Sequence, residues 1–72
     1  MDSETTYYVR TDRRALYSSV MCWRMKDGKF KFIFKGDKHW CVSGYLSPAH
    51  YLEKNGDAVF RVVPEEEIAL MF

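Results

Sequence analysis

The sequence contains no apolar run that approaches the roughly 20 residues needed to span a bilayer. Its mean hydropathy is -0.37, so we expect no membrane partner. Cysteine is also scarce: the chain has two, whereas small secreted domains stapled by disulfides carry about four to eight. Residues 1–6 are acidic and polar and contain neither the basic nor the apolar segment of a secretion signal. We therefore expect a cytoplasmic protein with reduced thiols.

Glycine and proline are few and stand as single turn signals, so the sequence contains no linker or repeat. Its 72 residues fit one small domain, spanning 1–72. A hydrophobic fraction of 47% and an aromatic fraction of 17% predict a packed globule rather than a disordered chain. The fold class expected is α+β, mainly β, with a three- to five-stranded antiparallel sheet and one or two short helices.

Alternating apolar and polar residues between turn signals predict short strands. These cover residues 5–10, 16–25, 29–35, 38–44 and 58–63. Ser47 and Pro48 form an N-terminal cap for a helix over 49–54, which Asn55 and Gly56 would end. A second helix is expected to begin at Pro64, followed by the apolar tail 68–72.

Two-residue turns at Asp27-Gly28 and Gly36-Asp37 would pair Lys26 with Lys29 and Lys35 with Lys38. One sheet face then carries Met21, Trp23, Met25, Phe30, Phe32, Phe34, His39 and Cys41. The other face carries Cys22, Arg24, Lys26, Lys29, Lys31, Ile33, Lys35, Lys38, Trp40 and Val42. A bulged three-residue loop, Lys26-Asp27-Gly28, is the alternative, but it would set Cys22 and Arg24 among the phenylalanines. We expect the first face to pack beneath Leu46, Tyr51, Leu52 and the 68–72 tail.

Cysteine and histidine supply a candidate zinc set: Cys22, His39, Cys41 and His50. The preferred register, however, places Cys22 on the opposite face from His39 and Cys41, which also disfavours a disulfide between the two cysteines. We therefore predict no metal or other cofactor. Catalysis is not expected either, because the sequence has no phosphate-binding glycine loop and no nucleophile elbow, and Glu65, Glu66 and Glu67 are consecutive and fan out around a helix.

The net charge of +1 conceals an uneven distribution. Residues 1–38 carry nine basic and five acidic side chains, or +4, and residues 39–72 carry two and five, or −3. The candidate binding surface is the Lys-rich face around Trp40, formed by Arg24, Lys26, Lys29, Lys31, Ile33, Lys35, Lys38 and Trp40. It combines an aromatic anchor with basic residues that attract an acidic partner.

These features predict a non-enzymatic interaction module that binds the acidic surface of a larger protein or complex. A chain this small suits an inhibitor or adaptor, for example a mobile-element or phage accessory protein. Nucleic-acid binding through the same residues is the alternative, because lysines also release counterions from phosphates. The apolar tail 68–72 offers a further surface for forming a homo-oligomer.

Overall fold

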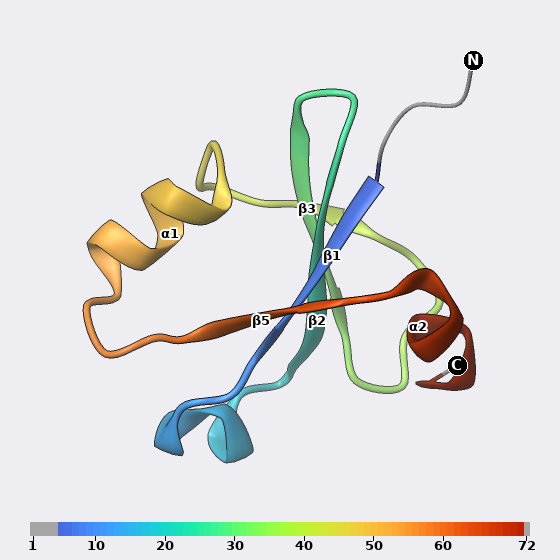
Figure 1. Cartoon of the computed structure of the whole chain (residues 1–72), viewed down its shortest axis with the longest axis horizontal. Coiled ribbons are helices and arrows are strands. Elements are labelled where there is room, and N and C mark those ends of the chain that lie inside the picture. The colour runs from blue at the N-terminus through green and yellow to red at the C-terminus, as the bar shows by residue number, and fades with distance from the viewer. Residues whose placement is uncertain (1–4, 72) are drawn as a thin grey trace.

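The computed structural model describes residues 5–71 and contains a five-stranded antiparallel sheet with two short α-helices (Figure 1). The elements are β1 (Thr5–Arg10), the 3₁₀ helix η1 (Arg13–Tyr17), β2 (Val20–Lys26), β3 (Lys29–Phe34), β4 (Cys41–Val42), α1 (Pro48–Lys54), β5 (Phe60–Val63) and α2 (Glu65–Met71). The strand order is β4-β3-β2-β1-β5. The predicted α+β class is therefore confirmed. Neither α-helix in residues 5–71 is long and apolar enough to cross a membrane.

The hairpin of β2 and β3 has the predicted two-residue turn. Asp27 and Gly28 both have positive φ, 53° and 73°, as a type I′ turn requires. Lys26 lies opposite Lys29, and the pairing continues to Cys22 opposite Ile33. The alternative bulged loop is therefore wrong.

The start of β2 differs from the prediction, because residues 13–17 form η1 instead of extending the strand. The Asp12 carboxylate accepts a hydrogen bond from the Arg14 amide, and the Asp12 carbonyl accepts one from the Ala15 amide. These bonds close a helical turn, which is a local alternative to pairing in a sheet.

The second turn lies one residue earlier than expected, and the strand predicted over 38–44 shrinks to Cys41–Val42. The Asp37 amide donates to the Phe34 carbonyl at 3.0 Å, with Gly36 at φ 81° in the third turn position. The Asp37 carboxylate then accepts from the Lys38 amide at 2.8 Å, which diverts that amide from the sheet. Further along, Phe32 pairs with Cys41, as the predicted register requires.

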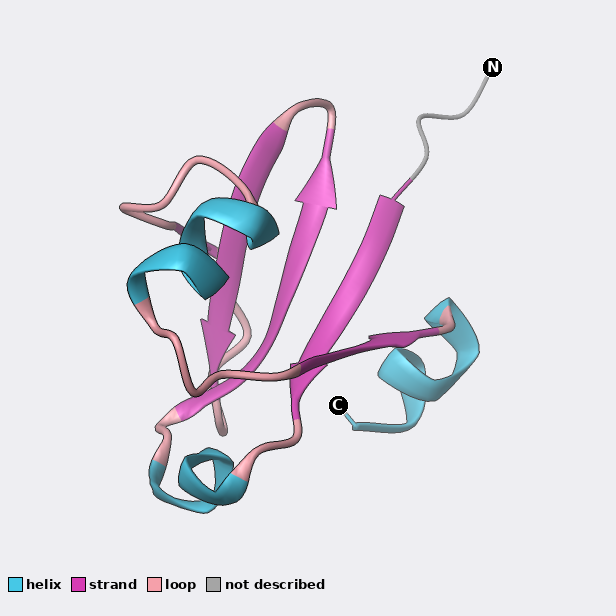
Figure 2. Ribbon diagram, turned by 60° about the vertical axis from the view of Figure 1, so that its left-hand side comes forward, coloured by secondary structure: helices cyan, strands magenta, loops and turns pink. Residues whose placement is uncertain are grey.

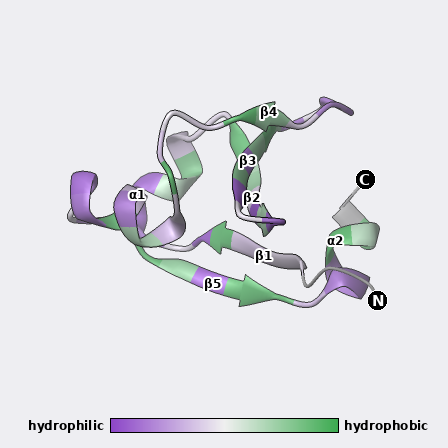
Figure 3. Ribbon diagram, turned by 90° about the horizontal axis from the view of Figure 1, so that it is seen from above, coloured by the Kyte–Doolittle hydropathy of each residue, from purple (hydrophilic) through white to green (hydrophobic). Residues whose placement is uncertain are grey.

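The sheet is covered on both faces, by α1 on one side and α2 on the other (Figure 2). The α1 face holds the aromatic core, in which the rings of Trp23, Tyr51 and Phe60 lie 4.9–5.2 Å apart, centroid to centroid. Phe30 and Leu52 also belong to it. The opposite face holds a smaller core of Cys22, Ile33, Val63 and Ile68. Figure 3 shows α2 beginning with a hydrophilic turn and continuing with apolar residues.

Three predictions about the core were wrong. Ile68, from the apolar tail, packs on the Cys22 face and not on the aromatic face, because α1 already fills the latter. Leu46 is 79% exposed and covers neither core. Met21 packs with the Cys22 cluster, because the sheet register shifts between Val20 and Cys22 and turns Met21 to that side. Of the remaining tail, Phe72 lies outside the described residues.

Candidate anion-binding site

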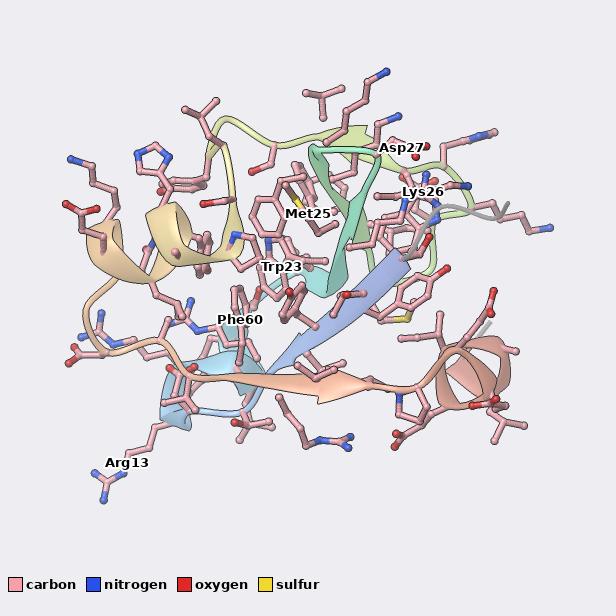
Figure 4. The ribbon with its side chains drawn as sticks, turned by 45° about the horizontal axis from the view of Figure 1, so that its top comes forward. Arg13, Trp23, Met25, Lys26, Asp27 and Phe60 are labelled. Carbon is pink, nitrogen blue, oxygen red and sulfur yellow. The ribbon has the colours of Figure 1, made fainter. Side chains whose placement is uncertain are left out.

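Two pairs of cations face each other across the β2–β3 hairpin. Lys26 lies opposite Lys29, and Arg24 lies opposite Lys31. Because the two pairs are separated by one intervening row of the sheet, all four side chains project from the same face. Together with Asp27 they line a cavity of about 200 Å³. Figure 4 shows Lys26 and Asp27 at the end of the hairpin, away from Trp23 and Phe60 in the aromatic core.

Trp40 holds Arg24 in place at the base of this cluster. The Arg24 guanidinium carbon lies 4.4 Å from the centre of the Trp40 ring, within the range of a cation–π contact. The indole packs in turn against the Cys22 core and lies 6.1 Å from the Tyr7 ring, centroid to centroid. Arg24 is thus stacked on a supported aromatic surface.

Arg24 also carries an unsatisfied polar group. Its Nε is buried and has no hydrogen-bond partner among the described residues. Burying a donor without a partner is costly, most of all on a charged group. This unmet donor adds to the energetic cost of holding Arg24 in the cluster.

The charges of the cluster are not compensated within the described part of the chain. In residues 5–71 the ion pairs are Arg10 with Asp12 and Arg61 with Glu67, and neither involves the β2–β3 hairpin. Asp27 is the single carboxylate among the five lining residues. Like charges directly opposite each other in a sheet destabilise it. The hairpin therefore retains an electrostatic cost that a bound anion would relieve.

The other predicted binding residues lie elsewhere. Ile33 is fully buried in the Cys22 core, so it presents no surface to a partner. Lys35 and Lys38 are exposed beyond the far end of β3, and Lys35 lies about 20 Å along the strand from Lys29. The cluster consists of Arg24, Lys26, Lys29 and Lys31, with Trp40 as support. We call these five residues the basic hairpin site.

The candidate zinc ligands do not converge. Cys22 is buried in the Cys22 core beneath α2, and the Cys41 thiol lies against the His39 carbonyl. His50 uses its Nδ1 to accept a hydrogen bond from the Leu46 amide at 3.0 Å. Among residues 5–71, no group of three or more histidine, cysteine or acidic residues could hold a metal ion. Both cysteines are free thiols.

The Cys22 environment also suppresses thiolate chemistry. Burial raises the pKa of the Cys22 thiol to about 11, and the positive charge of Arg24 offsets only part of that rise. Since the thiolate is the form that binds metals and attacks substrates, Cys22 is inert in the folded protein.

A second polar cluster, centred on Asp12, is missing from the sequence-based prediction. The Arg10 guanidinium binds the Asp12 carboxylate through Nε at 2.6 Å and through a second nitrogen at 3.0 Å. Arg10 also donates to the Tyr51 hydroxyl at 3.0 Å, and the Val59 amide donates to Asp12 at 3.4 Å. The hydrogen bonds from Arg10 are the main reason why the pKa of Asp12 falls to about 2. In the sequence, Thr11 to Arg14 reads as an ordinary polar turn, and nothing local marks its bonds to distant residues.

This cluster fixes η1, a segment that presents two strongly exposed large apolar side chains. Leu16 is 84% exposed and Tyr17 is 89% exposed, beside the exposed Arg13 and Arg14. The sequence-based prediction placed Leu16 and Tyr17 in a strand, not in a 3₁₀ helix.

Comparison with protein-family models, with curated proteins and with solved structures gave no match to this chain. The chemistry of its surfaces is therefore the basis on which a function is assigned.

Proposed function

We propose that this protein is a non-enzymatic interaction module that binds an acidic surface of a larger protein through the basic hairpin site. The observation that carries the proposal is the pair of like-charged rows, Lys26–Lys29 and Arg24–Lys31, without an ion pair in the described residues. An acidic partner supplies the missing counter-charge and accelerates association by attraction at a distance. The role of such a module is to inhibit its partner or to connect it to another protein.

The dimensions of the cavity favour recognition of one ionic group rather than a whole small molecule. Its volume is about 200 Å³, below the roughly 300–1,000 Å³ of typical ligand pockets. A carboxylate of a partner fits within it and reaches the guanidinium of Arg24, whose planar donors suit carboxylate geometry. A cavity of this size supports a protein as the partner, because a protein surface can place a single carboxylate in the cavity while its other residues make contacts around it.

Nucleic acid is the second candidate, because phosphates would also neutralise the cluster. Its strongest form, a base stacked on Trp40, is disfavoured because Arg24 already lies over the indole ring at 4.4 Å. What remains is contact with the phosphate backbone, which predicts binding that weakens steeply as salt is added.

The test compares two double charge reversals. Lys26→Glu/Lys29→Glu reverses one of the two cross-strand pairs, so the four cationic positions of the site then carry two positive and two negative charges. The substituted pair stays like-charged, so the repulsion within that pair is retained. Lys35→Glu/Lys38→Glu makes the same change in charge outside the site and serves as the matched control. Each protein is used to isolate partners from cells of the native host, and the partners are quantified by mass spectrometry.

We expect the first variant to lose a partner that the wild type and the control both retain. Equal recovery by all three proteins would contradict the assignment of the site. In parallel, fluorescence anisotropy with single- and double-stranded oligonucleotides at about 50 mM salt examines the alternative. If the wild type binds an oligonucleotide, and this binding weakens with salt and is lost in the Lys26→Glu/Lys29→Glu variant, then nucleic acid and not a protein is the ligand of the site.

A further inference from the structure

β5 forms one edge of the sheet, and its outer side has no neighbouring strand in residues 5–71. Figure 3 shows β5 at the rim of the sheet. The Thr11 amide donates to the Val59 carbonyl at 2.9 Å, which turns the backbone of Val59 toward β1. Because successive residues of a strand alternate in direction, the peptide groups of Phe60 and Val62 point outward. An edge of this kind is a template for another strand.

The side chains of β5 do little to protect this edge. Val62 in the strand and Val59 just before it are exposed, and the strand carries no lysine, the residue that commonly blocks such edges. Its one charged residue, Arg61, is already paired with Glu67 at 3.1 Å. A second strand would therefore meet an apolar edge whose single charge is balanced.

Complementary patches lie at the two ends of β5. Phe60, at its beginning, pairs with Arg10, close to η1, which exposes Arg13, Arg14, Leu16 and Tyr17. At its other end the chain enters α2, which exposes Glu65 and Glu66 and, at 86%, Leu70. Figure 1 shows η1 and α2 at opposite ends of β5, and Figure 4 shows Arg13 extending outward, far from Lys26.

We propose that a second copy of this chain binds at the β5 edge in an antiparallel, two-fold symmetric arrangement. Antiparallel pairing reverses one strand against the other, so α2 of each copy comes to lie beside η1 of its partner. Arg13 and Arg14 then face two glutamates, and Leu70 meets the exposed apolar residues of η1. The same contact occurs twice and leaves no open end, as a closed dimer requires.

The positions of the patches favour a second copy over an unrelated partner. A foreign strand would cover the edge alone and leave both patches exposed, whereas a symmetry-related copy covers the edge and both patches together. The expected oligomerisation surface is thus not the apolar tail as a whole, because Ile68 is buried within its own chain. It is the β5 edge with η1 and α2, and it is distinct from the basic hairpin site.

The test uses two charge reversals of the full chain. Both Arg13→Glu/Arg14→Glu and Glu65→Arg/Glu66→Arg place like charges at both copies of the contact, so each variant alone should dimerise at least about tenfold more weakly than the wild type. Mixing the two variants restores opposite charges at both contacts, and a heterodimer should form with an affinity near that of the wild type. Sedimentation equilibrium across a range of concentrations measures the association of the wild type, of each variant and of the mixture. Circular dichroism checks that each variant is folded.

The mixing experiment separates the proposal from a simple loss of folding, because an unfolded variant cannot be rescued by its counterpart. Val62→Lys supplies an independent test, since it adds a charge to the outer edge at an already exposed position and should also weaken the dimer. A wild-type protein that stays monomeric up to about 1 mM would overturn the proposal. So would a dimer that persists in both charge-reversed variants, or variants that fail to associate when mixed.

Discussion

Shortening Ile68 to alanine measures how strongly α2 is attached to the sheet. Ile68 is 4% exposed and packs with Cys22, Ile33 and Val63. The substitution removes three carbon atoms, worth about 0.8 kcal/mol each, or about 2.4 kcal/mol in transfer free energy. The unfilled cavity raises the expected loss in the free energy of unfolding to about 2.5–4 kcal/mol. A domain of this size is stable by roughly 4–11 kcal/mol in total, so the loss is a large share.

The assay is urea unfolding at low protein concentration, followed by far-ultraviolet circular dichroism and by tryptophan fluorescence. Trp23 lies in the aromatic core and Trp40 packs against the Cys22 core, so fluorescence reports on both sides of the sheet. Coincident transitions in the two signals would justify a two-state analysis. In a thermal scan, the same loss corresponds to a fall of roughly 17–26 °C in Tm.

Leu46→Ala is the control for this experiment. It shortens another large aliphatic side chain, but Leu46 is exposed, so the change in stability should stay within about 0.5 kcal/mol. An Ile68→Ala effect as small as that of the control would mean that α2 is not docked and that the second core does not form. A large effect at Leu46 would instead restore it as part of the cover over the aromatic face.

Two further predictions concern titratable groups. Because Arg10 lowers the pKa of Asp12 to about 2, below its usual 3.8, the ionised pair stabilises the fold above pH 4, and this contribution is lost as the pH falls from about 4 to 2. Asp12→Asn should therefore show a flatter decline of the urea midpoint over that interval than the wild type, and parallel declines would refute the role of the pair. Since burial raises the pKa of Cys22 to about 11, a thiol reagent at pH 8 should modify Cys41 quickly and Cys22 only upon unfolding. Two rapidly reacting thiols in the native protein, or a rapid phase that survives Cys41→Ser, would contradict this.

The parts of the fold that were predicted from the sequence depend on local chemistry. Asp27 and Gly28 determine a turn by their backbone preferences, and that turn sets the register of the whole hairpin. Ser47 begins α1 by accepting a hydrogen bond from the His50 amide, as expected of a capping residue. The convergence of Arg24, Lys26, Lys29 and Lys31 follows directly from the register.

The parts that were not predicted depend on contacts between distant residues. Cys22 and Ile33 alternate with cations along their strands, which suggests an exposed face, but Val63 from β5 and Ile68 from α2 cover them and complete a core. Trp40 was expected as an exposed anchor, but the same core supports it from beneath, so that Arg24 and not the indole faces the cavity. No local pattern specifies to which side of a sheet a C-terminal helix will turn.

The position of β2 between two cores has a consequence for how the length of this chain can vary. Its consecutive residues Cys22 and Trp23 belong to different cores, so inserting or deleting one residue in the middle of the strand would drive Arg24 into the aromatic core. The irregularity between Val20 and Cys22 is itself an added residue, tolerated because it lies at the end of the strand. Among chains that share this fold, we therefore expect length differences in the irregular segment 35–40 and in the connection between α1 and β5, with β2 constant in length.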